Sequence, residues 1–251
     1  MSTLRPIALA IAGFDPTSGA GVMADIKTFE LHQVYPMAIL SANTIQTEDH
    51  FIHVKWQEAE YTISQLSTIL ENYSISVVKI GIVKDLDTFK LYIDTIKGLS
   101  PITKIIWDPV LRSSSGFDFQ TIQLADSLVT VLQQIDLITP NYLEIHQLVT
   151  TNDDALQKAL ALSQYCDVLL KGGHNPNALG FDYYVSKEVI QTIPPTQLSD
   201  YPKHGSGCVL SSAITSNIAK GYNTLTAIQK AKAYIETFFN SNHTLLGYHA
   251  K

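Results

Sequence analysis

The sequence predicts an α/β fold in which helices cover both faces of a largely parallel β-sheet. Short, almost continuous apolar runs alternate with amphipathic segments along the chain, a pattern typical of parallel strands buried on both sides. Glycine-rich and polar turns follow these apolar runs. Because ligands in such folds bind at the carboxyl ends of the strands, we expect the functional residues in these turns.

The first half of the chain predicts a regular succession of strands and helices. Apolar side chains at helix spacing, such as Ile63, Leu66 and Leu70, define helical faces, whereas unbroken apolar runs define strands. Asp108-Pro109 ends one such run, since proline pushes the residue before it into an extended conformation. In order, we expect a strand over 7–12, a helix over 21–32, an extended segment over 37–45, a helix over 59–71, a strand over 77–83, a helix over 86–96 and a strand over 104–107.

The second half continues the alternation without a linker. Gly172 and Gly173 end a buried strand, and two short apolar runs after them read as a hairpin. No stretch rich in Pro, Gly or Ser divides the chain, so we expect one domain over 1–251. In order, we expect a helix over 122–133, a strand over 137–139, helices over 142–149 and 155–164, a strand over 167–170, hairpin strands over 181–185 and 189–193, and helices over 208–220 and 224–239.

Composition limits the class of protein. With 45% hydrophobic and 16% charged residues, the chain can build a large core. A net charge of −6 and the lack of a Lys/Arg cluster argue against a nucleic-acid partner. No apolar run approaches the roughly 20 residues needed to cross a bilayer, and the run over 7–12 reads as a strand rather than a signal peptide. Two cysteines are too few for a disulfide framework, which fits a cytoplasmic protein.

The segment over 203–213 carries the strongest chemical signal. Gly205 and Gly207 bracket Ser206, and Cys208 follows at the start of a helix. Glycines let backbone N–H groups converge on an anion, and the positive end of a helix favours negative charge. We therefore expect a phosphate site here, with a Cys208 thiol of lowered pKa that serves as a base. The competing interpretation is an inert, buried cysteine.

A second glycine-rich turn follows the first strand. The run over 12–21 includes Gly13, Asp15, Ala20 and Gly21, but no Gly-Lys-[Ser/Thr] of a P-loop follows it. Its glycine spacing does not match a dinucleotide fingerprint either. Asp15 is either a local cap or the acceptor of a hydrogen bond from a substrate hydroxyl.

Polar residues follow three further strands. Asp108 is either a cap or faces a metal or phosphate. Asn141 and Glu144 have the spacing of a capping box, and their oxygens also suit Mg²⁺. Lys171 ends a buried strand, where lysine is unusual, and could neutralise a nucleotide phosphate. His174 reads as a loop histidine.

Taken in their order along the chain, these motifs resemble the ribokinase superfamily. The resemblance rests on 13–28, Lys79-Ile80-Gly81, Asp108-Pro109-Val110, Thr139-Pro140-Asn141 with Glu144, Lys171-Gly172-Gly173-His174 and His204-Gly205-Ser206-Gly207-Cys208. The most similar branch is the hydroxymethylpyrimidine/phosphomethylpyrimidine kinases of thiamine biosynthesis. Sugar kinases of the superfamily carry aspartate where this chain has Cys208.

The resemblance implies a three-layer α/β/α sandwich and a function. That function is the ATP- and Mg²⁺-dependent phosphorylation of 4-amino-5-hydroxymethyl-2-methylpyrimidine and of its monophosphate, by a homodimer. A pyridoxal kinase of the same superfamily and a non-catalytic ligand sensor are the alternatives. By resemblance, Gln46 binds the pyrimidine together with Gly13, Asp15, Ala20, Gly21 and Val110; Gly205, Ser206 and Gly207 form an anion hole and Cys208 is the base; Asn141 and Glu144 order Mg²⁺; Lys171 and Asp108 contact the nucleotide.

Some positions depart from the branch pattern. Thr47 and Glu48 follow Gln46 where Asn-Thr is usual, and Ile82 follows Gly81 where Met is usual. The end of the chain, 247–251, lacks the usual glycine-rich tail with Pro-Val-Asn. These departures concern the choice of acceptor more than phosphoryl transfer.

Overall fold

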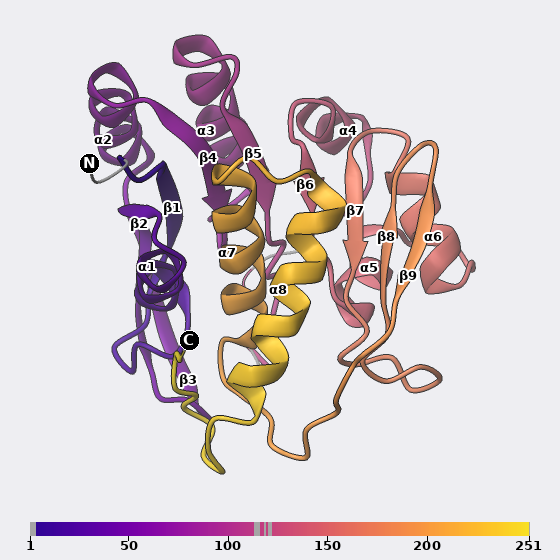
Figure 1. Ribbon diagram of the computed structural model, residues 1–251. Helices are drawn as coiled ribbons and strands as arrows, with labels where there is room; N and C mark the ends of the chain where they lie inside the picture. The colour runs from indigo at the N-terminus through magenta and orange to yellow at the C-terminus, as the bar shows by residue number, and fades with distance from the viewer. Residues whose placement is uncertain (1–3, 113–115, 118, 120–121, 251) are drawn as a thin grey trace.

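The protein is represented by a computed structural model that describes residues 4–112, 116–117, 119 and 122–250. In this part of the chain, nine strands form one sheet in the order β3-β2-β1-β4-β5-β6-β7-β8-β9 (Figure 1). The six central strands, β2, β1, β4, β5, β6 and β7, run parallel. β3 joins antiparallel at one edge, and β8 and β9 join antiparallel at the other. The strands are β1 Ile7–Phe14, β2 Tyr35–Gln46, β3 Phe51–Trp56, β4 Ile75–Ile80, β5 Lys104–Trp107, β6 Leu137–Ile138, β7 Asp167–Leu170, β8 Asp182–Val185 and β9 Ile190–Ile193.

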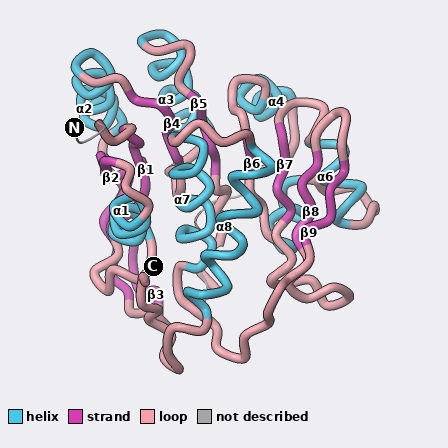
Figure 2. Tube along the Cα trace, viewed as in Figure 1, coloured by secondary structure: helices cyan, strands magenta, loops and turns pink. Residues whose placement is uncertain are grey.

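Helices cover both faces of the sheet, and α7 and α8 lie side by side across one face (Figures 1 and 2). The residues of β1 show why two layers form. Leu9 and Ile11 pack into the core beneath α2 and α3, whereas Ala8 and Ala10 face Phe29 of α1. The helices are α1 Gly21–Leu31, α2 Ala59–Asn72, α3 Leu86–Leu99, α4 Asp126–Leu132, α5 Tyr142–Leu148, α6 Ala155–Leu162, α7 Ser206–Ala219 and α8 Thr224–Phe239.

The expected three-layer α/β/α architecture with a largely parallel sheet is confirmed. Several expected element boundaries need correction; for example, the helix expected from 208 begins at Ser206. β3 was not expected, because its exposed His53 and Lys55 interrupt the apolar residues without a regular alternation of buried and exposed side chains. β4 begins at Ile75 and ends at Ile80, so Gly81–Val83 form a loop rather than the end of a strand. The helix expected from 122 begins at Asp126.

The late start of α4 has a local cause. The N–H of Leu124 donates to the carbonyl of Leu148 at 2.6 Å, which ties the preceding segment to the end of α5. Of the serine-rich run that follows Asp108-Pro109, residues 113–115 lie outside the described part of the chain. No helix in the described ranges is long and apolar enough to cross a membrane.

Candidate active site

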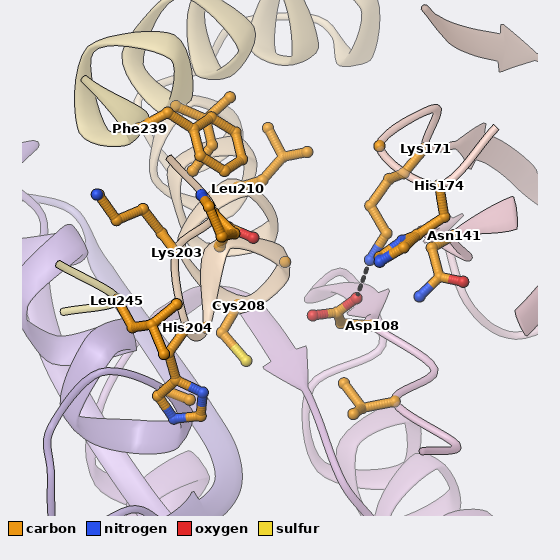
Figure 3. A pocket seen from close by; sticks show the side chains of 18 of the residues that line it. Asp108, Asn141, Lys171, His174, Lys203, His204, Cys208, Leu210, Phe239 and Leu245 are labelled. Atoms are coloured by element: carbon orange, nitrogen blue, oxygen red, sulfur yellow. Dashed lines mark hydrogen bonds and ion pairs between the residues drawn. The ribbon is translucent and has the colours of Figure 1, made fainter. Parts of the chain in front are cut away.

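A groove of about 1260 Å³ lies where the parallel strands end and α7 begins. Figure 3 shows Lys171 joined to Asp108 on one side of this groove and His204 on the other, with the sulfur of Cys208 between them. The fold thus brings together residues up to 195 positions apart in the sequence, 13 to 208. All residues to which the sequence assigned a site role line this groove: Gly13, Asp15, Ala20, Gly21, Gln46, Asp108, Val110, Asn141, Glu144, Lys171, Gly205, Ser206, Gly207 and Cys208.

The start of α7 depends on glycine. Gly205 caps the helix in the left-handed region, with φ 70°, which non-glycine residues rarely adopt. A Cβ built at Gly205 would also lie 2.0 Å from the carbonyl oxygen of Gly19. At Gly207 the approach is to charged groups: a Cβ there would lie 3.4 Å from Nζ of Lys171. The start of α7 therefore approaches the 12–21 loop closely, and Gly207 leaves room for the Lys171 ammonium beside it.

Cys208 lies in this first turn and is partly exposed to the groove. Burial raises the pKa of its thiol to about 11, even though the charge of Lys79 and a backbone hydrogen bond from Gly21 act to lower it. The expectation of a lowered pKa is therefore wrong for the protein without ligands. Loss of hydration outweighs the helix terminus, and the thiol is protonated at neutral pH.

Asp15 is used by its own loop. The residue is 1% exposed, and its oxygens accept hydrogen bonds from Thr17 and from the backbone of Ala20. Nε2 of His204 lies 2.8 Å from Oδ2. Burial alone would raise the pKa of Asp15, but the hydrogen bonds with His204 and Thr17 hold it below the usual value. These contacts support the local-cap interpretation: Asp15 holds the glycine-rich loop against the start of α7. Its contact with a substrate hydroxyl stays a prediction.

Asp108 similarly has partners for both oxygens. It is fully buried; Oδ1 accepts from Nζ of Lys171 at 2.8 Å and from Thr139 at 3.0 Å. Oδ2 accepts from the hydroxyl of Ser211 in α7 at 3.1 Å. Burial would raise the pKa of Asp108, but Lys171 and Lys79 hold it below the usual value. Asp108 therefore positions Lys171 and α7, and its contact with a nucleotide stays a prediction.

Asn141 and Glu144 form the capping box that their spacing predicts. Oδ1 of Asn141 accepts from the backbone of Leu143 and Glu144, and Oε2 of Glu144 accepts from the backbone of Asn141 at 2.7 Å. Nζ of Lys171 lies 3.9 Å from Oε2 of Glu144. Burial raises the pKa of Glu144 to about 7, against the opposing charge of Lys171.

The donor set limits how a metal would bind. No group of three or more His, Cys, Asp or Glu residues in the described ranges could form a metal cage. Asn141 uses its oxygen in the cap, so Glu144 is the better ligand of the two: its Oε1 makes no hydrogen bond within the described chain. One carboxylate oxygen without a hydrogen bond, beside the expected phosphate site, fits a Mg²⁺ ion that is held mainly by phosphates and water.

Gln46 and Val110 also line the groove. Gln46 ends β2, is half-buried, and makes no side-chain hydrogen bond within the described residues. A half-buried amide with unused donors and acceptor suits a polar, uncharged ring. Phe51 of the unexpected strand β3 lines the same region.

Sequence reasoning missed two groups next to this site. His204 was quoted only as part of a motif, yet it connects the two glycine-rich segments through Asp15. Lys79 of β4 and Asp25 of α1 form a fully buried ion pair of 2.6 Å. No local signal reveals it, because the partners lie 54 residues apart.

Comparison with known proteins shows the family of this chain. The family model described as phosphomethylpyrimidine kinase matches residues 15–250. The chain belongs to the phosphomethylpyrimidine kinase family. A hydroxymethylpyrimidine/phosphomethylpyrimidine kinase of Staphylococcus aureus is 31% identical over 91% of this chain and 86% of its own.

Solved structures show the same fold. A phosphomethylpyrimidine kinase from Clostridium difficile has 27% identity and a TM-score of 0.76, and the match covers 93% of this chain and 99% of that chain. A Bacillus subtilis pyridoxal kinase, solved as an ADP complex, has 26% identity and a TM-score of 0.78 over 94% of this chain and 92% of that chain. As a member of the phosphomethylpyrimidine kinase family, the protein is a kinase, so the expectation of an enzyme is confirmed.

Proposed function

We propose that the protein transfers the γ-phosphoryl group of ATP to 4-amino-5-hydroxymethyl-2-methylpyrimidine and then to its monophosphate. The observation that supports this most is the closeness of Gly207 to Lys171: the N-terminus of α7 and a buried ammonium lie next to each other in the groove that Cys208 also lines. Helix N–H groups and a lysine together suit a phosphate group in transfer.

The acceptor would lie between Cys208 and Gln46. The amide of Gln46 would hydrogen-bond the polar edge of the neutral ring, while Val110 and Phe51 offer it apolar contacts. The hydroxymethyl group would then point to Cys208. A neutral ring needs an amide rather than a charged partner, because an unpaired buried charge would be destabilising.

In the first transfer, the ionised fraction of Cys208 would accept the hydroxyl proton of the acceptor; this fraction is small at neutral pH, because burial raises the pKa of the thiol to about 11. The hydroxyl oxygen forms a bond to the γ-phosphorus while the bond from phosphorus to the bridging oxygen breaks, and its electrons remain on ADP. Lys171 and the N–H groups of α7 would stabilise the transferring charge, which is the main requirement of phosphoryl transfer. In the second transfer the acceptor is already an anion and needs no base.

Mg²⁺ bound to the nucleotide would neutralise phosphate charge. Glu144 is the residue that would meet it through Oε1, directly or through water. Lys171 would contact the phosphates while Glu144 contacts the metal; Nζ of Lys171 and Oε2 of Glu144 lie 3.9 Å apart.

The test is ADP release with Mg·ATP and three separate acceptors: the hydroxymethylpyrimidine, its monophosphate and pyridoxal. Turnover of the first two supports the proposal. Turnover of pyridoxal alone would show that the acceptor is pyridoxal and would contradict the proposed hydrogen bond between Gln46 and the pyrimidine. Turnover of the hydroxymethylpyrimidine but not of its monophosphate would restrict the proposal to the first transfer.

A further inference from the structure

Lys79 is a fully buried cation that the proposed chemistry has not used. It lies in β4, 0% exposed, and its Nζ donates to Oδ1 of Asp25 at 2.6 Å. The other oxygen of Asp25, Oδ2, is buried without a hydrogen-bond partner in the described chain. A buried ion pair with unsatisfied atoms is a poor source of stability, since apolar residues in its place are often equally stabilising. Its position therefore calls for another explanation.

The pair is connected to the first turn of α7 from two directions. The hydroxyl of Ser212 donates to Oδ1 of Asp25 at 2.7 Å, and Ser212 lies one helical turn after Cys208. Asp25 itself lies one turn after Gly21, whose backbone hydrogen-bonds Cys208. The thiol, the carboxylate and the ammonium therefore occupy one corner, where α1, β4 and α7 meet.

Four charged groups act on the sulfur of Cys208. Lys79 from β4 favours the thiolate, and Asp108 and Asp25 oppose it. Lys171, which follows β7, is attracted to a thiolate. Among the charges, Lys79 has the largest effect on the thiol pKa. Asp25 keeps Lys79 charged: burial would lower the pKa of this lysine, but the carboxylate outweighs burial and raises it.

We propose that Lys79, held by Asp25 beneath the groove, is a positioning residue that favours the thiolate form of Cys208. It touches neither substrate and acts through the field at the sulfur and through the Asp25–Ser212 contact with α7. The inference rests on the proposed role of Cys208 as the base. It gives the thiol two sources of positive charge: the N-terminus of α7, and Lys79 below it.

The experiment measures the pH dependence of Cys208 alkylation by iodoacetamide, followed by peptide mass spectrometry. In Lys79→Met the profile should move to higher pH. At any fixed pH below the midpoint, alkylation of Cys208 should then be about tenfold slower than in the wild type. Lys79→Arg should restore the native profile. In Lys79→Met, kcat with the hydroxymethylpyrimidine should fall about tenfold at neutral pH while KM for ATP stays within about twofold.

Two further variants separate this role from a structural one. Lys79→Met with Asp25→Asn removes both charges with nearly unchanged shapes, and buried pairs replaced in this way often leave stability intact. The double variant should show a smaller shift in the same direction, because it also removes the Asp25 carboxylate, which opposes the thiolate less than Lys79 favours it. Lys158→Met removes a buried lysine of α6 outside the groove, bonded to His146 at 2.8 Å, and should leave the profile unchanged.

A native alkylation profile in folded Lys79→Met, or in the folded double variant, would overturn the inference. This result differs from a failure of the proposed function, because the profile reads the thiol without any acceptor. Full turnover in Cys208→Ala would instead remove Cys208 from the chemistry.

Discussion

Nζ of Lys171 lies 2.8 Å from Oδ1 of Asp108, and this buried pair holds the ammonium against the first turn of α7. The hydroxyl of Ser211 fastens α7 to the same carboxylate. Burial would lower the pKa of Lys171, but Asp108 and Glu144 outweigh it and keep the lysine charged. A phosphoryl group at this junction would meet a fixed positive charge that needs no rearrangement during transfer.

Removing this charge should reduce catalysis strongly. In Lys171→Met we expect kcat/KM for ATP to fall by about 10²–10³, the usual loss for one group that stabilises a transition state. Loss of the partner of Asp108 should also lower the free energy of unfolding by about 3 kcal/mol. Steady-state kinetics and urea denaturation measure the two effects. Native kinetics in Lys171→Met would contradict this account of the anion site.

Gly205 should not tolerate a side chain. In Gly205→Ala, the left-handed backbone and the approach to Gly19 both oppose the new methyl group, so unfolding free energy should fall by about 3 kcal/mol and activity should be lost. Gly98→Ala is the matched control, because a Cβ at Gly98 in α3 meets nothing within 4 Å. That variant should be about 0.5–1 kcal/mol more stable. Equal stability of the two variants in urea would contradict the prediction.

The thiol of Cys208 should react slowly at neutral pH. With a pKa of about 11, its thiolate fraction rises roughly tenfold for each pH unit up to that value, and the alkylation rate should rise with it. Cys166 is the internal reference: it is buried beside β7, and burial raises the pKa of its thiol further. A Cys208 rate that levels off near pH 7 would show that burial does not control this thiol.

Gln46 should affect the acceptor and not the nucleotide. In Gln46→Ala, kcat/KM for the hydroxymethylpyrimidine should fall about 10- to 100-fold, the loss expected for one or two buried hydrogen bonds. KM for ATP should stay unchanged. Gln134→Ala, which loses only a contact with the Thr130 carbonyl outside the groove, should behave as wild type. An equal loss of kcat/KM for the hydroxymethylpyrimidine and for ATP would contradict the assignment of Gln46 to the acceptor site.

Sequence patterns predicted those features that are set locally. The apolar runs gave the sheet, and the spacing of Asn141 and Glu144 gave the capping box that the structure contains. The fold brings the turns after the strands together, since every proposed site residue lines one groove; the roles of these residues stay predictions.

Features that depend on the assembled fold were not predictable. The pKa of Cys208 is set by burial and by Lys79, and neither can be read from the glycines beside it. Asp15 resembled a ligand for a hydroxyl, but its partner His204 lies 189 residues away. The edge strand β3 has too mixed a pattern for a buried strand and too little alternation for an amphipathic one.

The most direct test of the central claim is ADP release with Mg·ATP and the hydroxymethylpyrimidine, compared between wild type and Cys208→Ala at neutral pH. We expect turnover in the wild type and a fall of about 10²-fold or more in kcat for the variant, with KM for ATP little changed. Wild-type turnover in Cys208→Ala would contradict the claim that the thiol at the start of α7 is the base.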